Sequence, residues 1–261
     1  MKIAVIGTGI SGNVAAYHLN KHHDVTVFEA NDYVGGHTHT HDIDWAGQSY
    51  AVDTGFIVFN EKTYPNFIAL LDELGVASRP TTMSFSVKSE LGGLEYNGHS
   101  LNTLFAQRSN IFNLSFHRMI RDILRFNREA PLSLENGDAE IGLGEFLRRG
   151  GYSQMFIDHY IIPMGAAIWS TDPEQMQEFP ARFFIRFFHN HGLLSITDRP
   201  RWFVIEGGSR EYVKPLIRSF EDRIRLKSPI ESIRRFPTHV EVKPYNGEAE
   251  QFDQVFIATH S

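Results

Sequence analysis

The chain has 261 residues, a formal net charge of −6 and a pI near 6.1. This acidic balance gives no reason to expect a nucleic-acid partner. The absence of cysteine excludes disulfides, thiolate nucleophiles, dithiol redox chemistry and cysteine metal sites from these residues. The N-terminal apolar run is too short for a signal peptide, and no stretch reaches the roughly 20 apolar residues that span a bilayer. We therefore expect a soluble, cytoplasmic protein.

The first residues have the pattern of a strand, a glycine turn and a helix. An apolar run, the segment GTGISG and a helix-prone stretch follow one another in residues 2–19. Gly7 permits a sharp turn, Gly9 lets the backbone approach a pyrophosphate, and Gly12 lets the helix pack on the strand. The helix start would present unpaired N–H groups to the phosphates. The residues expected at this phosphate site are Gly7, Gly9, Ile10, Ser11 and Gly12.

A second predicted strand, at residues 24–28, ends in Glu29, 22 residues after Gly7. This spacing is typical of the carboxylate that meets the adenosine ribose hydroxyls in dinucleotide-binding folds. The next residue, Ala30, is predicted to lie at the same site. The alternative is a glycine turn in an α/β protein that binds no nucleotide.

Gly35 and Gly36 follow the acidic strand end after a short loop. This continuation resembles the flavin-containing amine oxidase superfamily, which includes protoporphyrinogen oxidases and phytoene desaturase-like proteins. The resemblance implies that the Gly-Gly backbone lies near the FAD diphosphate. The family usually has Arg or Lys next, whereas this sequence has His37, a weaker and pH-dependent donor. We therefore predict a cofactor contact for His37.

His37, His39 and His41 alternate with threonines. In an extended chain this period would place the three imidazoles on one face, where they could bind a metal. Adjacent positions of one strand rarely converge on a single tetrahedral ion. We therefore predict solvated or hydrogen-bonded histidines and no metal.

Residues 50–60 read as a strand interrupted by a glycine. In the resembling family a D-x-G segment at this position brings the backbone close to the isoalloxazine ring, which implies Thr54, Gly55 and Phe56 here. Glycine suits this role, because a residue without Cβ lets a flat ring approach the main chain. The alternative is a strand bulge.

Residues 66–204 are predicted to form an inserted α+β substrate or cap domain, without a phosphate-binding motif of its own. A helix from residue 64 should end at Gly75. Residues 82–87 and 94–96 should form a hairpin around a turn at 90–93.

A long helix is predicted over residues 110–128, and Pro131 to Gly137 should break it. Four arginines share one side of this helix: Arg118, Arg121, Arg125 and Arg128. They indicate either a membrane-surface or acid-binding face, or a solvated side with Asp122 and Glu129 as partners.

Two apolar stretches of the inserted domain have two interpretations each. Residues 160–170 resemble the family segment beneath the substrate cavity, and plain core is the alternative. Residues 181–191 contain four phenylalanines at helical spacing, which form either core or an aromatic wall. A wall would favour an apolar, elongated substrate. Arg182 and Arg186 beside it would favour an anionic headgroup over a cation.

The last segments resemble the return of the family's chain to the FAD domain. A strand, a Gly-Gly turn and a helix occupy residues 201–220. Residues 229–233 match the strand whose main chain meets the adenine, which implies Ile230. Residues 239–242 and 252–259 should pair across Asn246-Gly247, and the second should be buried and lead toward the diphosphate at Ala258.

We therefore predict an α/β fold, with a Rossmann-like FAD-binding domain at residues 1–65 and 205–261 and the inserted domain at 66–204. The resemblance covers about two thirds of a family member, since a second substrate segment and a C-terminal Gly-Asp flavin motif are not present in this sequence. It implies an FAD-dependent oxidoreductase that moves hydride from a small apolar, lipid-like or amine substrate to flavin N5. The alternatives are a non-catalytic or truncated dinucleotide-binding protein and an NAD(P) dehydrogenase. Peripheral membrane contact is an open option, and no residue is assigned a catalytic role.

Overall fold

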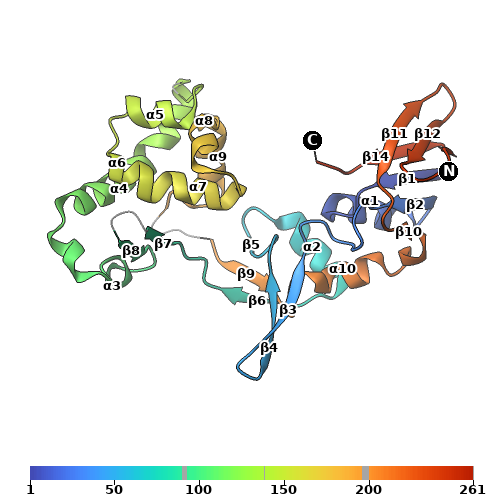
Figure 1. Cartoon of the computed structure of the whole chain (residues 1–261), viewed down its shortest axis with the longest axis horizontal. Helices are drawn as coiled ribbons and strands as arrows, with labels where there is room; N and C mark the ends of the chain where they lie inside the picture. Colours follow the sequence, from blue (N-terminus) through green and yellow to red (C-terminus); the bar gives the residue numbers. More distant parts are fainter. Residues whose placement is uncertain (90–92, 138, 196–199, 261) are drawn as a thin grey trace. The chain divides into compact units, whose positions relative to one another are not determined.

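Two compact units make up the chain (Figure 1). The computed structural model describes residues 1–89, 93–137, 139–195 and 200–260. The first unit is discontinuous and consists of Met1–Thr81 and Trp202–Ser261, and the second is Thr82–Arg201. The second unit is thus inserted between the two parts of the first.

The junctions between the units differ from the expected 65/66 and 204/205, because residues 66–81 lie in the first unit. Helix α2 (Pro65–Leu74) packs against α10 (Arg210–Ile217), and Gly75 ends α2 as expected. Strand β6 (Ser78–Thr81) pairs with β9 (Trp202–Ile205). These long-range contacts hold the segment in the first unit.

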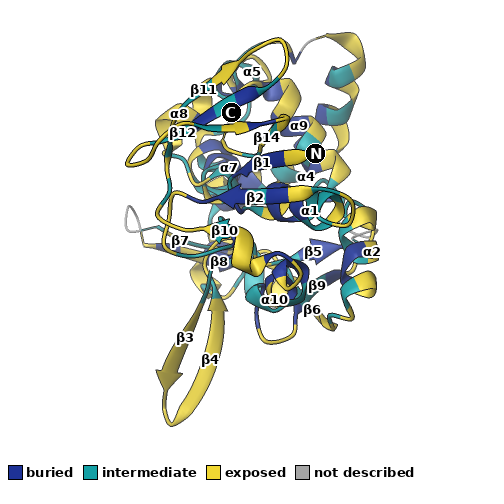
Figure 2. Cartoon of the chain, turned by 90° about the vertical axis from the view of Figure 1, so that its right-hand side faces the viewer, coloured by how far each residue is buried: buried dark blue, intermediate teal, exposed yellow. Residues whose placement is uncertain are grey.

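A parallel sheet forms the centre of the first unit. Its strands, in the order β10-β2-β1-β14, are β1 (Lys2–Ile6), β2 (Asp24–Phe28), β10 (Ile224–Arg225) and β14 (Gln254–Ile257). Val5 belongs to one core cluster, and Ala4 and Ile6 belong to another. Burial on both faces explains why β1 is continuously apolar instead of alternating. Strands β1 and β2 are accordingly mostly dark in Figure 2.

Each face of this sheet has its own cover. Helix α1 (Ile10–Leu19) packs on β1 and β2 and contacts α10. On the other face, Phe252 meets Phe28 edge-on, with 6.0 Å between ring centroids. This second cover is the antiparallel sheet of β11 (Ile230–Arg235), β12 (Val240–Pro244) and β13 (Glu250–Phe252). A short helix, η3 (Glu221–Arg223), precedes β10. These layers confirm the α/β class.

The expected pairing of residues 239–242 with 252–259 is correct only as far as Phe252. There the chain leaves the antiparallel sheet, and β14 pairs in parallel with β1 instead. The expectation that β14 is buried is wrong, because Phe256 and Ile257 are 43% and 59% exposed. In the described chain β14 is an edge strand that pairs with β1 on one side.

The predicted strand at residues 50–60 is divided into two elements. Strand β4 (Gln48–Asp53) forms an antiparallel hairpin with β3 (Thr40–Trp45), which is largely exposed (Figure 2). Strand β5 (Phe59–Asn60) pairs instead with β9. The hairpin turn has two residues with positive φ, Ala46 and Gly47, as tight hairpins require.

The second unit contains helices around one aromatic core and a small hairpin. Its helices are α3 (Leu101–Leu104), η1 (Arg108–Phe112), α4 (Leu114–Asn136), α5 (Leu143–Arg149), α6 (Gln154–Phe156), η2 (Ile157–Ile161), α7 (Ile162–Trp169), α8 (Pro173–Glu178) and α9 (Ala181–Asn190). The hairpin is β7 (Ser86–Ser89) with β8 (Leu94–Asn97). Residues 90–92 of its predicted turn lie outside the described residues.

Helix α4 starts later and ends later than predicted. Asn113 caps its start, since its side chain accepts hydrogen bonds from Ser115 N at 3.0 Å and Phe116 N at 3.2 Å. The predicted break at Pro131 is wrong, because the helix continues to Asn136. A proline inside a helix costs about 3 kcal/mol. Burial of other residues of α4 in the core, among them Phe116, Met119, Phe126 and Ala130, offsets this cost.

The phenylalanines of α9 divide between core and surface. Phe184 and Phe188 are fully buried and stack at 4.1 Å, so they are core residues and do not form a cleft wall. Phe183 is 55% exposed. In the stretch 160–170, Ile161, Ile162 and Gly165 are likewise buried. None of the helices in the described residues is both long and apolar enough to cross a membrane.

Candidate functional site

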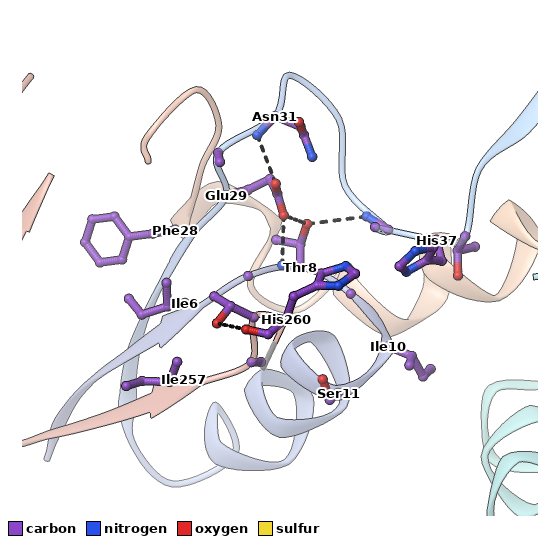
Figure 3. Close-up of a pocket in the computed structure, with 18 of the residues that line it drawn as sticks. Ile6, Thr8, Ile10, Ser11, Phe28, Glu29, Asn31, His37, Ile257 and His260 are labelled. Carbon is purple, nitrogen blue, oxygen red and sulfur yellow. Dashed lines mark hydrogen bonds between the residues drawn. The ribbon is translucent and has the colours of Figure 1, made fainter. Parts of the chain in front are cut away.

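A cavity of about 1210 Å³ opens at the carboxyl ends of β1, β2 and β14, within the first unit (Figure 3). It is larger than the roughly 300–1,000 Å³ of most ligand pockets, which suits an elongated ligand. Most of its lining comes from residues 6–11, 28–31, 35–38, 228–233 and 257–260, and the rest comes from the aromatic residues Tyr33, Phe56, Tyr64, Phe67 and Tyr212. The predicted cofactor residues all line it except Gly12, Thr54 and Gly55.

The three glycines of the first turn have different surroundings. Gly7 has a φ of +99°, and a Cβ there would lie 2.5 Å from the Ala258 carbonyl oxygen. A Cβ on Gly12 would lie 1.9 Å from the carbonyl oxygen of Gly7. A Cβ on Gly9 would meet no protein atom within 4 Å and would enter the cavity. Packing therefore explains Gly7 and Gly12, whereas Gly9 leaves room for a ligand.

The N-terminus of α1 opens into the same cavity. Gly9, Ile10 and Ser11 line it, and Figure 3 shows the latter two on the first turn of the helix. Within the described chain no side chain caps this helix start. Unpaired N–H groups and the positive end of the helix dipole favour an anion at such a position.

Glu29 is buried at the end of β2, with 6% of its surface exposed. Its Oε2 accepts hydrogen bonds from the Thr8 hydroxyl and, at 2.9 Å, from the Thr8 backbone N–H. Its Oε1 accepts one from the Asn31 backbone N–H at 2.9 Å. The carboxylate is thus held between the glycine turn and the loop after β2 (Figure 3).

The hydrogen bonds to Glu29 decide its charge. Burial by itself would raise the pKa of this carboxyl. The bonds from the Thr8 side chain and from the backbone N–H groups of Asn31 and Thr8 outweigh burial, so the pKa of Glu29 lies below its ordinary value. The group is ionised at neutral pH and can accept a further hydrogen bond.

Gly35 and Gly36 pack against the first glycine turn. The N–H of Gly35 donates to the Thr8 carbonyl oxygen at 3.1 Å. Both glycines have positive φ, and a Cβ on Gly36 would lie 3.0 Å from the Cα of Gly9. The two glycine segments therefore form one continuous wall of the cavity.

The segment of Thr54, Gly55 and Phe56 is fixed by backbone contacts with the preceding histidines. Thr54 N donates to His39 O at 3.0 Å, and Phe56 N donates to His37 O at 2.8 Å. A Cβ on Gly55 would lie 2.1 Å from the His37 carbonyl oxygen. Packing against His37 thus requires the glycine, and of the three residues Phe56 lines the cavity.

Asp53 has a role that the sequence did not reveal. Its Oδ1 accepts hydrogen bonds from Ser209 N at 2.9 Å, from the Ser209 hydroxyl at 2.7 Å and from the Thr40 hydroxyl at 2.5 Å. Thr40 Oγ1 in turn accepts one from Arg210 N at 3.0 Å. The hairpin of β3 and β4 therefore caps the start of α10. From the alternating segment, Thr40 and not a histidine makes these contacts.

The last two predicted residues, Ile230 and Ala258, also line the cavity. Ser228 N donates to Glu29 O at 2.8 Å, which places residues 228–233 beside the end of β2. Ala258 N donates to Ile6 O at 2.8 Å, which continues the pairing of β14 with β1. Non-local backbone bonds thus bring both residues to the glycine turn.

The histidines are distributed over two places. The His39 ring stacks on Tyr33 at 4.4 Å and meets the His41 ring at 4.2 Å. The His37 ring lies 5.2 Å from that of His260, and both line the cavity (Figure 3). Across the described ranges no three His, Cys, Asp or Glu side chains could hold a metal. Sequence reasoning missed His260, which no motif marks, and Thr8, whose hydroxyl between two glycines was a usable signal.

Comparison with known proteins gives the family of the chain. A model of the family described as flavin containing amine oxidoreductase matches residues 10–261. A Synechococcus elongatus protein named "Probable zeta-carotene desaturase" is 23% identical over 95% of this chain and 53% of its own length. Protoporphyrinogen oxidase 2 of Arabidopsis thaliana is 26% identical over 67% of this chain and 34% of its own. The structure of cyclohexylamine oxidase from Brevibacterium oxydans matches with a TM-score of 0.73 and 19% identity, over 99% of this chain and 57% of that chain.

The chain belongs to the flavin-containing amine oxidoreductase family. This confirms the predicted superfamily, the α/β fold and FAD as the cofactor. The chain spans about half the length of curated relatives that it matches, 53% and 54% in two cases. The expected two thirds is therefore too high.

Proposed function

We propose that the cavity of the first unit binds FAD and that the whole protein oxidises a small organic substrate. The observation that carries this proposal is the open space above Gly9, next to the uncapped start of α1 and to the ionised Glu29. The protein's own packing does not require glycine at position 9, whereas a ligand that approaches the backbone there would. The residues present fit a dinucleotide with a negative diphosphate.

The roles proposed for the residues follow from their positions. The backbone N–H groups at the start of α1 would hold the diphosphate. Glu29 Oε1, which accepts one hydrogen bond from Asn31, would accept another from a ribose hydroxyl. The backbone around Ile230 would meet the adenine, and Phe56 would stand near the flavin ring. Other cofactor contacts are proposed for residues that also line the cavity: Gly7, Ser11, Ala30, Gly35, Gly36, His37 and Ala258. Gly12, Thr54 and Gly55 do not line it, so their proposed part is to shape the two turns beside the cofactor.

FAD, when bound, would supply two-electron chemistry by accepting a hydride at N5. We propose an apolar substrate, lipid-like or an amine. The buried Phe184 and Phe188 do not support an apolar cleft wall, so the substrate class rests on the family resemblance alone. Arg182 pairs with Glu140, so of the two arginines on α9 only Arg186 stands exposed without a described ion pair. We also propose a cytoplasmic location with peripheral membrane contact.

FAD titration of the purified chain, followed by flavin fluorescence and the visible spectrum, tests the binding step. Gly9→Val should abolish saturable binding, because its side chain would fill the space above the turn. Gly98→Val is the matched control, since a Cβ there also meets almost nothing and the residue lies in the second unit. Equal binding by wild type and Gly9→Val would refute the proposed site.

Turnover needs a separate test, because cofactor binding does not imply oxidation. Candidate amines and fatty acyl compounds are added to the FAD-loaded chain without oxygen. Bleaching of the flavin by one of them would support an oxidoreductase. A loaded flavin that none of them bleaches would favour the rival function, a dinucleotide-binding chain without activity of its own.

A further inference from the structure

An exposed apolar corner lies in the second unit where η1 meets α4. Phe112 and Leu114 are 87% and 84% exposed, the highest values among the large apolar side chains described. Their neighbour Ile111 is 45% exposed. Single exposed apolar residues are ordinary, but a cluster at one point indicates contact with something other than water.

Two arginines share this face of the helix. Arg118 and Arg121 follow Leu114 by four and seven residues, which places all three on one side of α4. Both arginines are exposed, and neither forms an ion pair within the described chain. The two arginines in the first half of α4 are therefore free to bind an anionic partner.

The far half of the same helix behaves differently. Arg125 pairs with Asp122 at 3.5 Å and lies 4.0 Å from the centre of the Tyr152 ring. Arg128 pairs with Glu129 at 2.6 Å. Arg125 and Arg128 therefore form the solvated, ion-paired side that was one of the two predictions for this helix. On α4, a partner could bind arginines only in the first half of the helix.

The sequence around the corner lacks acidic residues. No Asp or Glu occurs between Glu95 and Asp122, although the whole chain has a formal charge of −6. Arg108 adds a third cation to this segment, on η1. The corner is therefore positively charged although the whole chain is acidic. Only this part of the surface, and not the net charge, would attract an anionic partner.

We propose that the α4 corner, defined as Ile111, Phe112, Leu114, Arg118 and Arg121, docks on an anionic lipid surface. Exposed Phe and Leu beside Arg is the composition with which interfacial helices enter the boundary between headgroups and acyl chains. Arginines bind phosphate groups by paired hydrogen bonds. The chain would lie on the membrane through this corner.

Co-sedimentation with lipid vesicles tests the proposal on the whole chain. The chain should bind vesicles of phosphatidylcholine mixed with phosphatidylserine, and it should not bind phosphatidylcholine alone. Binding should weaken as salt is raised, because salt screens the arginines. No binding to the mixed vesicles, or equal binding to both kinds, would overturn the proposal.

Paired variants then locate the binding surface. Arg118→Gln with Arg121→Gln should weaken binding roughly 5-fold for each arginine. Phe112→Ser with Leu114→Ser should also weaken it, at every salt concentration. The control is Leu132→Ser with Arg148→Gln, which changes one exposed leucine and one exposed arginine outside the corner. An equal loss in the control would overturn the assignment to the corner.

Two further measurements separate lipid docking from misfolding and from self-association. All these side chains are exposed, so the thermal midpoint of each variant should match wild type, and a lower midpoint would assign the loss to folding. Size-exclusion chromatography should give the same oligomeric state for wild type and corner variants. A change of that state, together with no lipid binding, would mean that the corner joins two copies of the chain.

Discussion

Helices α1 and α10 begin alike in sequence and have opposite surroundings at their N-termini. Each follows a strand and a glycine-containing turn. At α10 the Asp53 carboxylate accepts from Ser209 N at 2.9 Å, and Thr40 Oγ1 accepts from Arg210 N at 3.0 Å. At α1 no described side chain caps the start, and the first turn faces the cavity.

The difference shows when a glycine-containing turn before a helix can serve as a binding site. The N–H groups at a helix start need acceptors, and a negative charge there is favourable. For α10 the chain supplies the carboxylate from a remote hairpin. For α1 it supplies none, which leaves the position to a ligand. The motif marks a possible anion site, and the rest of the fold decides whether the protein fills it.

Among the substitutions that test this difference between α1 and α10, Gly12→Ala should reduce the free energy of unfolding most. The added Cβ would lie 1.9 Å from the Gly7 carbonyl oxygen, so the helix must move away from the strand. We expect a loss of about 3 kcal/mol in the free energy of unfolding, measured by urea denaturation. Ser11→Ala, on the same exposed turn, is the control and should be near wild type. Wild-type stability of Gly12→Ala would mean that α1 does not pack so closely on β1.

Asp53→Ala tests whether Asp53 caps the N-terminus of α10. It removes the acceptor of three hydrogen bonds at the helix start, and we expect a loss of about 2 kcal/mol. Urea denaturation checks this value. Asp44→Ala is the matched control, since Asp44 is exposed on the same hairpin. Equal small losses in both variants would show that Asp53 does not cap the helix.

Glu29→Gln should cause a smaller loss in the free energy of unfolding, and the size of this loss should depend on pH. At neutral pH we expect about 1.5 kcal/mol, because charged hydrogen bonds from Thr8 and Asn31 become neutral ones. The pKa of Glu29 is lower in the folded state, so its ionised form stabilises the fold. This contribution is complete above the unfolded-state pKa of about 4.3 and is lost as pH falls through the folded pKa.

Unfolding free energies of wild type and Glu29→Gln, measured from neutral to acid pH, check this sign. The difference between the two proteins should shrink on acidification. Glu61→Gln, at an exposed position, should show no such trend. A difference that grows toward acid pH would contradict the lowered pKa.

Gly9→Val should have the smallest effect on the stability of the FAD-free chain. Its φ of −64° suits any residue, and the space above it is open, so we expect a change within about 0.5 kcal/mol. FAD should raise the thermal midpoint of wild type and leave that of Gly9→Val unchanged. A large loss of stability without FAD would mean that Gly9 serves packing, as Gly12 does.

Local signals predicted the centre of the fold and most of the candidate site. The β1-turn-α1-β2 unit is a continuous stretch of about thirty residues whose glycines and apolar runs act on their own neighbours, so sequence pattern predicts it well. The position of Glu29 at the cavity followed from the same local unit, whereas the positions of Gly35 and Gly36 followed from the resemblance to the flavin-containing amine oxidase superfamily. For the local unit and Glu29, sequence pattern by itself was sufficient.

Only the tertiary structure decided the remaining features, because they depend on contacts between distant segments. Asp53 caps a helix 156 residues further along the chain, and Gly55 is required by the His37 carbonyl oxygen. Helix α4 continues through Pro131 because core packing offsets the lost hydrogen bond. Strand β14 is apolar yet exposed because it lies at the sheet edge. Secondary-structure propensity depends on a few neighbouring residues, whereas burial and helix capping depend on which distant segment of the chain packs at that position.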